Sequence, residues 1–89
     1  MTPNLRELYR CSLLRVLEAN DTRWGLSLVG IEVNVGAFGF RGRGLDCTEQ
    51  ELRYLGGKGL AEPVNKLISP ENQTWRITAA GRDWLAQNG

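Results

Sequence analysis

Residues 48–60 read TEQELRYLGGKGL, and this stretch, with the one that follows it, decides the fold. Its two inner leucines are three residues apart, which is the spacing of a buried helix face. Thr48 and Glu51 match the Thr-x-x-Glu capping box, in which side chains satisfy the unpaired N–H groups at a helix start. Gly59 suits the left-handed residue that ends a helix. We therefore predict a helix that is capped by Thr48 and ends near Gly59.

Residues 73–85, QTWRITAAGRDWL, run from a strand directly into a closing helix. Trp75 and Ile77 alternate with a charged residue, which gives the strand one buried and one solvent-facing side. Thr78 is a suitable cap for a helix over residues 79–87.

The segment between these stretches completes a hairpin. Residues 62–68 are the first predicted strand and residues 73–78 the second. The connection SPEN at residues 69–72 is a turn, because its proline fixes the backbone and does not extend a strand.

These residues resemble a segment of bacterial winged-helix proteins. Residues 75–85, WRITAAGRDWL, are similar to the segment that leads from their wing into the final helix: aromatic, any residue, aliphatic, Thr, two variable residues, Gly, three variable residues, Leu. Residues 52–60, LRYLGGKGL, are similar to the end of their recognition helix. The match covers residues 48–87 and is to small proteins of bacteria and Mu-like prophages. It implies one domain over residues 1–89 with a mainly α fold and a small β-hairpin. That fold is a winged helix-turn-helix with three helices, a two-stranded wing and a C-terminal helix.

The first half of the chain agrees with this order in its helix count. Residues 3–19 predict a first helix with one apolar stripe, which consists of Leu5, Leu8, Tyr9, Ser12, Leu13, Val16 and Leu17. Residues 26–38 fit a helix, whereas the alternation of IEVNV at residues 31–35 fits a strand, and the glycines nearby lower helix propensity. We interpret residues 26–38 as the second helix because the winged-helix order requires one there.

Composition excludes several classes of chemistry. The chain has 11 Lys and Arg against 10 Asp and Glu, a net charge of +1, so its overall charge does not predict phosphate binding. It has no histidine, which excludes imidazole catalysis and histidine metal sites. Cys11 and Cys47 have no nearby cysteine partner, and we expect reduced thiols in a cytoplasmic protein. Residues 36–44, GAFGFRGRG, lack the Gly-Lys-Ser/Thr ending of a P-loop. We therefore expect no enzyme activity, cofactor or metal, and the absence of a long apolar run predicts no membrane partner.

The candidate nucleic-acid interface is the exposed face of the helix over residues 48–60. With its leucines buried, steps of 100° place Gln50, Arg53, Tyr54 and Gly57 on the opposite face. In a winged helix this face enters the major groove, where Gln50 would pair with adenine and Arg53 with guanine or a phosphate. The alternative is an ordinary solvated helix face.

Further cations could contact the DNA backbone. Arg41 and Arg43 lie in a glycine-bordered loop that could straddle a phosphate or enter a minor groove, although solubilising loop charges are the alternative. Lys58 and Lys66 complete the set with Arg53. Five such contacts would give a salt slope of about −4.5, so a monomer would bind duplex DNA weakly and would need a homodimer or another protein for useful affinity.

The charge of the helix over residues 48–60 weighs against tight binding. Glu49 and Glu51 offset Arg53 and Lys58, so the helix is neutral. Two functions follow from the sequence. The first is a DNA-binding module, either a small transcriptional regulator or a phage accessory protein. The alternative is a protein–protein interaction module on the same scaffold without intrinsic DNA binding.

Overall fold

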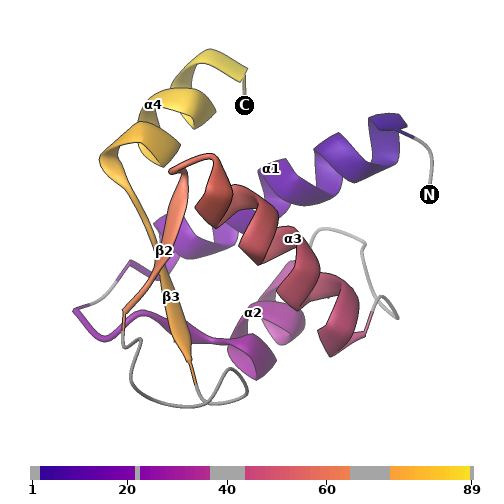
Figure 1. The fold of residues 1–89 in the computed structure, drawn as a ribbon, viewed down its shortest axis with the longest axis vertical. Helices are drawn as coiled ribbons and strands as arrows, with labels where there is room; N and C mark the ends of the chain where they lie inside the picture. The colour runs from indigo at the N-terminus through magenta and orange to yellow at the C-terminus, as the bar shows by residue number, and fades with distance from the viewer. Residues whose placement is uncertain (1–2, 22, 37–43, 65–72, 89) are drawn as a thin grey trace.

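The computed structural model describes residues 3–21, 23–36, 44–64 and 73–88. These residues form four helices and a three-stranded antiparallel sheet of order β1-β3-β2 (Figure 1). In chain order the elements are α1 (Pro3–Ala19), β1 (Leu26–Ser27), α2 (Leu28–Val35), α3 (Leu45–Gly57), β2 (Ala61–Pro63), β3 (Thr74–Ile77) and α4 (Ala79–Asn88). The described chain is mainly helical, as the sequence predicts, and its sheet has one strand more than the predicted hairpin.

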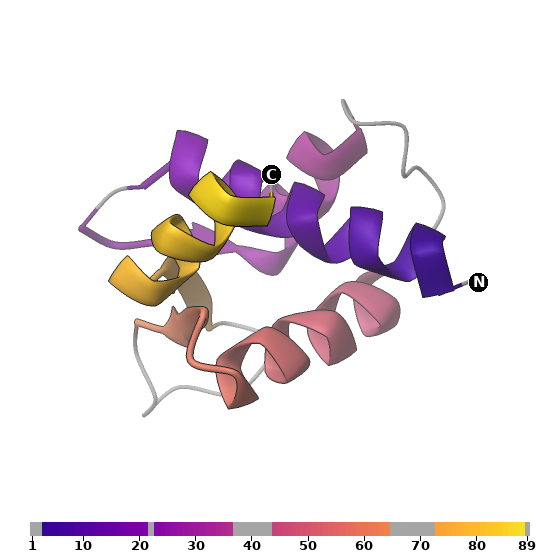
Figure 2. The same ribbon diagram turned by 90° about the horizontal axis from the view of Figure 1, so that it is seen from above.

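Helix α1 is the element against which most of the others pack. Helices α2, α3 and α4 and strand β3 all contact it. Figure 2 shows α3 along one side of α1 and α4 beside its C-terminal half. Helices α3 and α4 therefore both pack against α1.

The core draws apolar side chains from every helix and from β2 and β3. It consists of Tyr9, Leu13, Leu14, Val16, Leu17, Leu28, Ile31, Val35, Leu52, Leu55, Ala61, Trp75, Ile77 and Leu85. Each buried aliphatic side chain stabilises the fold by about 1.5–3 kcal/mol relative to an exposed one. The predicted stripe of α1 is buried from Tyr9 onward, but Leu5 and Leu8 at its start are exposed. The prediction was wrong for these two because the core begins one turn later than the stripe.

The ambiguous segment contains both a strand and a helix. Leu26 and Ser27 pair with Trp75 and Thr74 of β3, and α2 follows at once. Ser27 allows the strand to pass directly into the helix, because its backbone is extended and its hydroxyl accepts a hydrogen bond from Gly30 N at 3.1 Å. The predicted helix is thus confirmed over Leu28–Val35, and the strand before it was missed. The last two residues of the predicted helix lie outside the described residues.

Helix α3 begins earlier than predicted. It starts at Leu45, so Thr48 lies inside the helix, where its side chain is fully buried. The predicted capping box was wrong, because the acceptor at this helix start comes from a different helix. Glu32 of α2 accepts a hydrogen bond from Gly44 N at 3.1 Å and another from the Thr48 hydroxyl at 2.8 Å. A carboxylate at this end of a helix is favoured by the helix dipole.

Helix α4 begins as predicted. The Thr78 hydroxyl accepts a hydrogen bond from Gly81 N at 3.0 Å and donates one to Gly59 O at 2.6 Å. Gly59 has the predicted left-handed backbone, with φ of 75°. At Gly81 a Cβ atom would lie 2.2 Å from Leu60 O, so only glycine allows this close approach of α4. Thr78 therefore fixes the start of α4 to the turn after α3.

The hairpin strands are shorter in the structure than in the prediction. Ala61 pairs with Ile77 and Pro63 with Trp75, and Val64 N extends the ladder to Thr74 O at 2.8 Å. The predicted turn, and the parts of both predicted strands nearest to it, lie outside the described residues. The pairing of β2 with β3 confirms the hairpin itself.

Candidate functional site

The outward face of α3 carries two of the predicted contact residues. Gln50 and Arg53 are both exposed, as predicted from the 100° steps. Arg53 is not independent, because its Nη2 lies 2.7 Å from Glu49 Oε1 one turn earlier. Asp46 is also exposed and belongs to the first turn. The outward face therefore holds two carboxylates and one guanidinium, a net charge of −1.

Gly57 ends this face without a structural reason for being glycine. Its φ is not positive, and a Cβ atom built there would meet no other atom within 4 Å. Glycine lowers helix stability relative to alanine, so the fold alone does not favour it. The missing side chain leaves the backbone at the end of α3 open to close approach by a ligand.

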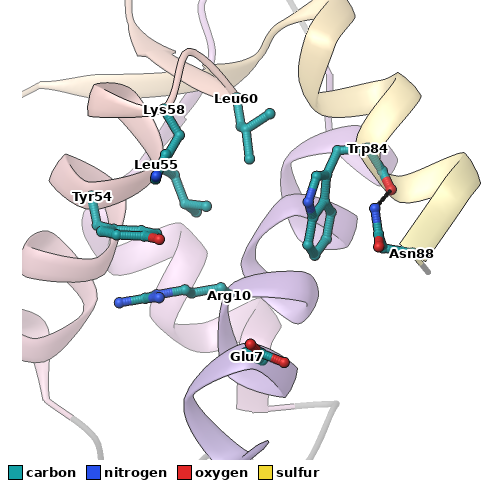
Figure 3. Close-up of a pocket in the computed structure, with 8 residues that line it drawn as sticks. All are labelled: Glu7, Arg10, Tyr54, Leu55, Lys58, Leu60, Trp84 and Asn88. Atoms are coloured by element: carbon teal, nitrogen blue, oxygen red, sulfur yellow. Dashed lines mark hydrogen bonds between the residues drawn. The ribbon is translucent and has the colours of Figure 1, made fainter. Parts of the chain in front are cut away.

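Tyr54 is exposed, as the 100° steps predict, and Lys58, which follows α3, is exposed too. Both line a cavity of about 500 Å³ between α1, α3 and α4 (Figure 3). Tyr54 lies at the edge of the exposed face of α3 that turns toward α1. The other residues that line the cavity are Glu7, Arg10, Leu55, Leu60, Trp84 and Asn88.

Arg10 forms one wall of this cavity. Its guanidinium carbon lies 3.5 Å from the centre of the Tyr54 ring, and Lys58 Nζ lies 5.6 Å from the same point. Arg10 Nε is also bonded to Glu51 Oε2, and Arg6 Nε lies 3.6 Å from Glu51 Oε1. Glu51, which the sequence assigns to the capping box, instead holds α3 to the two arginines of α1. Stacking and ion pairing together fix the position of Arg10.

A second network lies behind α3. The Tyr9 hydroxyl is 2.5 Å from Thr48 Oγ1, and Thr48 donates its single proton toward Glu32 or Gly44 O. Thr48 can therefore only accept from Tyr9, which requires the phenol to keep its proton. Burial raises the pKa of Tyr9, in agreement with that assignment. This network orients α3 and does not face the cavity.

A third cluster joins the sheet to α4. Asp21 Oδ1 accepts a hydrogen bond from Arg76 Nε at 3.1 Å, and Asp21 Oδ2 is paired with Arg82. The hydrogen bond from Arg76 holds the pKa of Asp21 below its usual value. These contacts account for two of the arginines as structural groups.

The sequence did not predict the cavity, and part of the predicted interface is not described by the structure. Arg41, Arg43 and Lys66 lie outside the described residues. Arg10 is not among the predicted site residues, although its place next to Tyr9 at the edge of the buried stripe of α1 was a usable indication.

Comparison with protein-family models, with curated proteins and with solved structures finds no match. Within the described ranges, none of the helices has the length and apolar character needed to cross a membrane. In the same ranges, no three acidic, cysteine or histidine side chains gather in a way that could hold a metal ion.

Proposed function

We propose that this chain is a winged helix-turn-helix module that binds double-stranded DNA. The observation that carries the proposal is the element order, helix, strand, two helices and two strands, with β1 paired to β3. This order is compatible with the winged helix-turn-helix that the sequence resembles, in which α3 would be the recognition helix. The exposed positions of Gln50 and Arg53 on α3 support the same proposal.

In this proposal α3 enters the major groove with its outward face. Gln50 would contact adenine, and Arg53 would contact guanine or a phosphate, each bidentate contact contributing about 1–3 kcal/mol of discrimination. The absent side chain of Gly57 would allow the end of α3 to approach the duplex closely. Arg41, Arg43 and Lys66, which lie outside the described residues, would contact phosphates.

The electrostatics of α3 make the proposed binding weak. Glu49 competes with DNA for Arg53, and Asp46 adds a second negative charge to the outward face. Affinity would therefore come mainly from the flanking cations and from pairing of two modules on one site. The proposed role is that of a small transcriptional regulator or a phage accessory protein, which would bind DNA as a pair of modules.

The test is titration of a fluorescently labelled mixed-sequence duplex at about 50 mM salt, followed by anisotropy. We expect weak binding with a log–log salt slope of about −4.5 if five cations contribute, which are Arg41, Arg43, Arg53, Lys58 and Lys66. Arg41→Ala with Arg43→Ala should reduce that slope by about 1.8, at about 0.9 per phosphate contact. Arg15→Ala removes one charge from the exposed side of α1 and should leave the slope unchanged. Absence of binding at low salt, with no effect of the double substitution, would overturn the proposal.

One observation favours a second function, a protein–protein interaction module on the same scaffold. The net charge of −1 on the outward face of α3 suits a basic partner surface better than a phosphate backbone. Glu49→Gln distinguishes the two functions, because it releases Arg53. The substitution should strengthen duplex binding, whereas it should weaken binding of a basic protein partner.

A further inference from the structure

The cavity between α1, α3 and α4 shares only Tyr54 and Lys58 with the predicted nucleic-acid interface. Its volume of about 500 Å³ lies within the range of small-molecule sites, which runs from roughly 300 to 1,000 Å³. Leu55 is buried, and Leu60 and Trp84 are half-buried, so the cavity has an apolar floor and one aromatic wall. Such sites bind by apolar contact and use a few polar groups for orientation.

The lining contains one cation, Lys58, that is not already held by an ion pair among the described residues. Three lining side chains are charged, Glu7, Arg10 and Lys58, with a net charge of +1. Arg10 is already paired with Glu51 and stacked on Tyr54. Lys58 lines the cavity and has no ion pair with any residue in the described part of the chain; its Nζ lies 5.6 Å from the centre of the Tyr54 ring.

The arrangement of these groups separates the charged end from the apolar surface. Figure 3 shows Lys58 at one end of the cavity with Leu55 and Leu60, Glu7 at the other end, and the Trp84 ring along one side. Arg10 covers the Tyr54 ring, so Trp84 offers the aromatic surface that remains for a ligand.

We propose that this cavity binds a small organic monocarboxylate with a flat apolar body. The carboxylate pairs with Lys58, and the apolar body packs between Trp84, Leu55 and Leu60. A second negative charge is disfavoured by Glu7. This inference goes beyond the proposed DNA-binding function and does not depend on it.

The probe for this site is 3-phenylpropanoate, titrated into ¹⁵N-labelled full-length chain without DNA. We expect saturable shifts of the Trp84 indole N–H and of the Leu60 and Lys58 amide signals in the millimolar range. The uncharged 3-phenylpropanamide and the short propanoate separate the two halves of the recognition, and each should bind more weakly than the probe. Equal shifts with either control compound would overturn the proposal.

Lys58→Gln tests the charge pairing, and Arg53→Gln is its matched control on the outward face of α3. Both residues are exposed, so both variants should fold. Lys58→Gln should weaken binding by about 2- to 5-fold, which is the effect of a solvent-exposed ion pair, and Arg53→Gln should leave it unchanged. Equal affinity in Lys58→Gln and the unaltered chain would overturn the proposal.

A response only to an acetylated peptide with Phe beside Asp would also overturn it, because the cavity would then belong to a polypeptide partner. Since no DNA is present, failure here is distinct from failure of the duplex titration.

Discussion

Helices α3 and α4 begin in opposite ways. The first turn of α4 is capped by Thr78, the residue directly before it. The first turn of α3 has no side-chain cap from its own segment, and the backbone at Gly44 is bonded instead to Glu32 of α2. The start of α4 is therefore a local property of the chain, whereas the start of α3 depends on α2 being in place.

This difference bears on function because α3 carries most of the described candidate residues. Gln50, Arg53 and Tyr54 belong to this helix, and Lys58 is its C-cap. The hydrogen bonds from Gly44 and Thr48 to Glu32 contribute to their positions, together with the ion pairs of Glu51 and the buried leucines of α3. One carboxylate outside α3 therefore affects the orientation of both candidate sites.

The largest effect is expected for Glu32→Ala, which removes the contacts between α2 and the start of α3. Gly44 N and the buried Thr48 hydroxyl lose a charged acceptor, and we expect a loss of about 1.5–3 kcal/mol in the free energy of unfolding. Urea denaturation measures the loss, and amide hydrogen exchange locates it in the first turn of α3. Glu32→Gln keeps one acceptor and should restore part of the stability. An unchanged free energy of unfolding in Glu32→Ala would mean that α3 begins independently of α2.

Thr78→Ala is the matching change at the start of α4, where the cap comes from the neighbouring residue. It removes the cap of α4 and the hydrogen bond to Gly59 O, and we expect a loss of about 1 kcal/mol. Thr78→Ser keeps the hydroxyl and serves as the control. The two caps share no partner, so the losses in a Thr78→Ala, Glu32→Ala double variant should add to within about 0.5 kcal/mol. Strong non-additivity would show that the two helix starts are not separate.

A smaller effect is expected from acid titration of Asp21, which ties Arg82 of α4 to Arg76 of β3. Its folded-state pKa is lowered, so its stabilisation is present at neutral pH and is lost as pH falls below the ordinary value of 3.8 and through the folded value. Arg76 and Arg82 are 37% and 46% exposed, so we expect a contribution below about 1 kcal/mol. Urea unfolding across this pH range, compared with Asp21→Asn, isolates the contribution. Identical pH profiles for the two proteins would contradict it.

Gly57→Ala should have the smallest effect on stability, and the opposite sign. Its Cβ meets no neighbour, so we expect a gain of up to about 0.5 kcal/mol, together with weaker duplex binding if the end of α3 approaches DNA. The same change at Gly81 is a contrasting control, because a Cβ there clashes with Leu60 O and should destabilise the fold. Anisotropy and thermal unfolding measure the two properties. A gain in stability with no change in duplex binding would assign Gly57 no part in the interface.

The same contrast explains which parts of the fold the sequence could predict. The start of α4, the left-handed Gly59 and the pairing of β2 with β3 follow from neighbouring residues, and each prediction was confirmed. The predicted start of α3 was wrong, because the group that accepts the hydrogen bond from Gly44 N belongs to Glu32, 12 residues earlier and on another helix. Strand β1 was missed because two residues are too short for a visible alternation, and their partner strand is far along the chain.

The candidate site also has a part that follows from neighbouring residues and a part that depends on the tertiary fold. Helical periodicity alone correctly placed Gln50 and Arg53 on the exposed surface of α3. The cavity could not be predicted, because Arg10 and Tyr54 come from opposite halves of the sequence and meet only when α1 and α3 pack. Periodicity gives the direction of a side chain from its own helix axis, and the helix that will face it is a property of the tertiary fold.

The lengths of the outer strands have a consequence for self-association. Strands β1 and β2, which form the two edges of the sheet, have two and three residues, and β2 ends in Pro63, which has no N–H to donate. Over the described residues, addition of another chain to either edge would gain few main-chain hydrogen bonds. These stretches of edge therefore disfavour self-association through the sheet and favour contact through side chains on the helices.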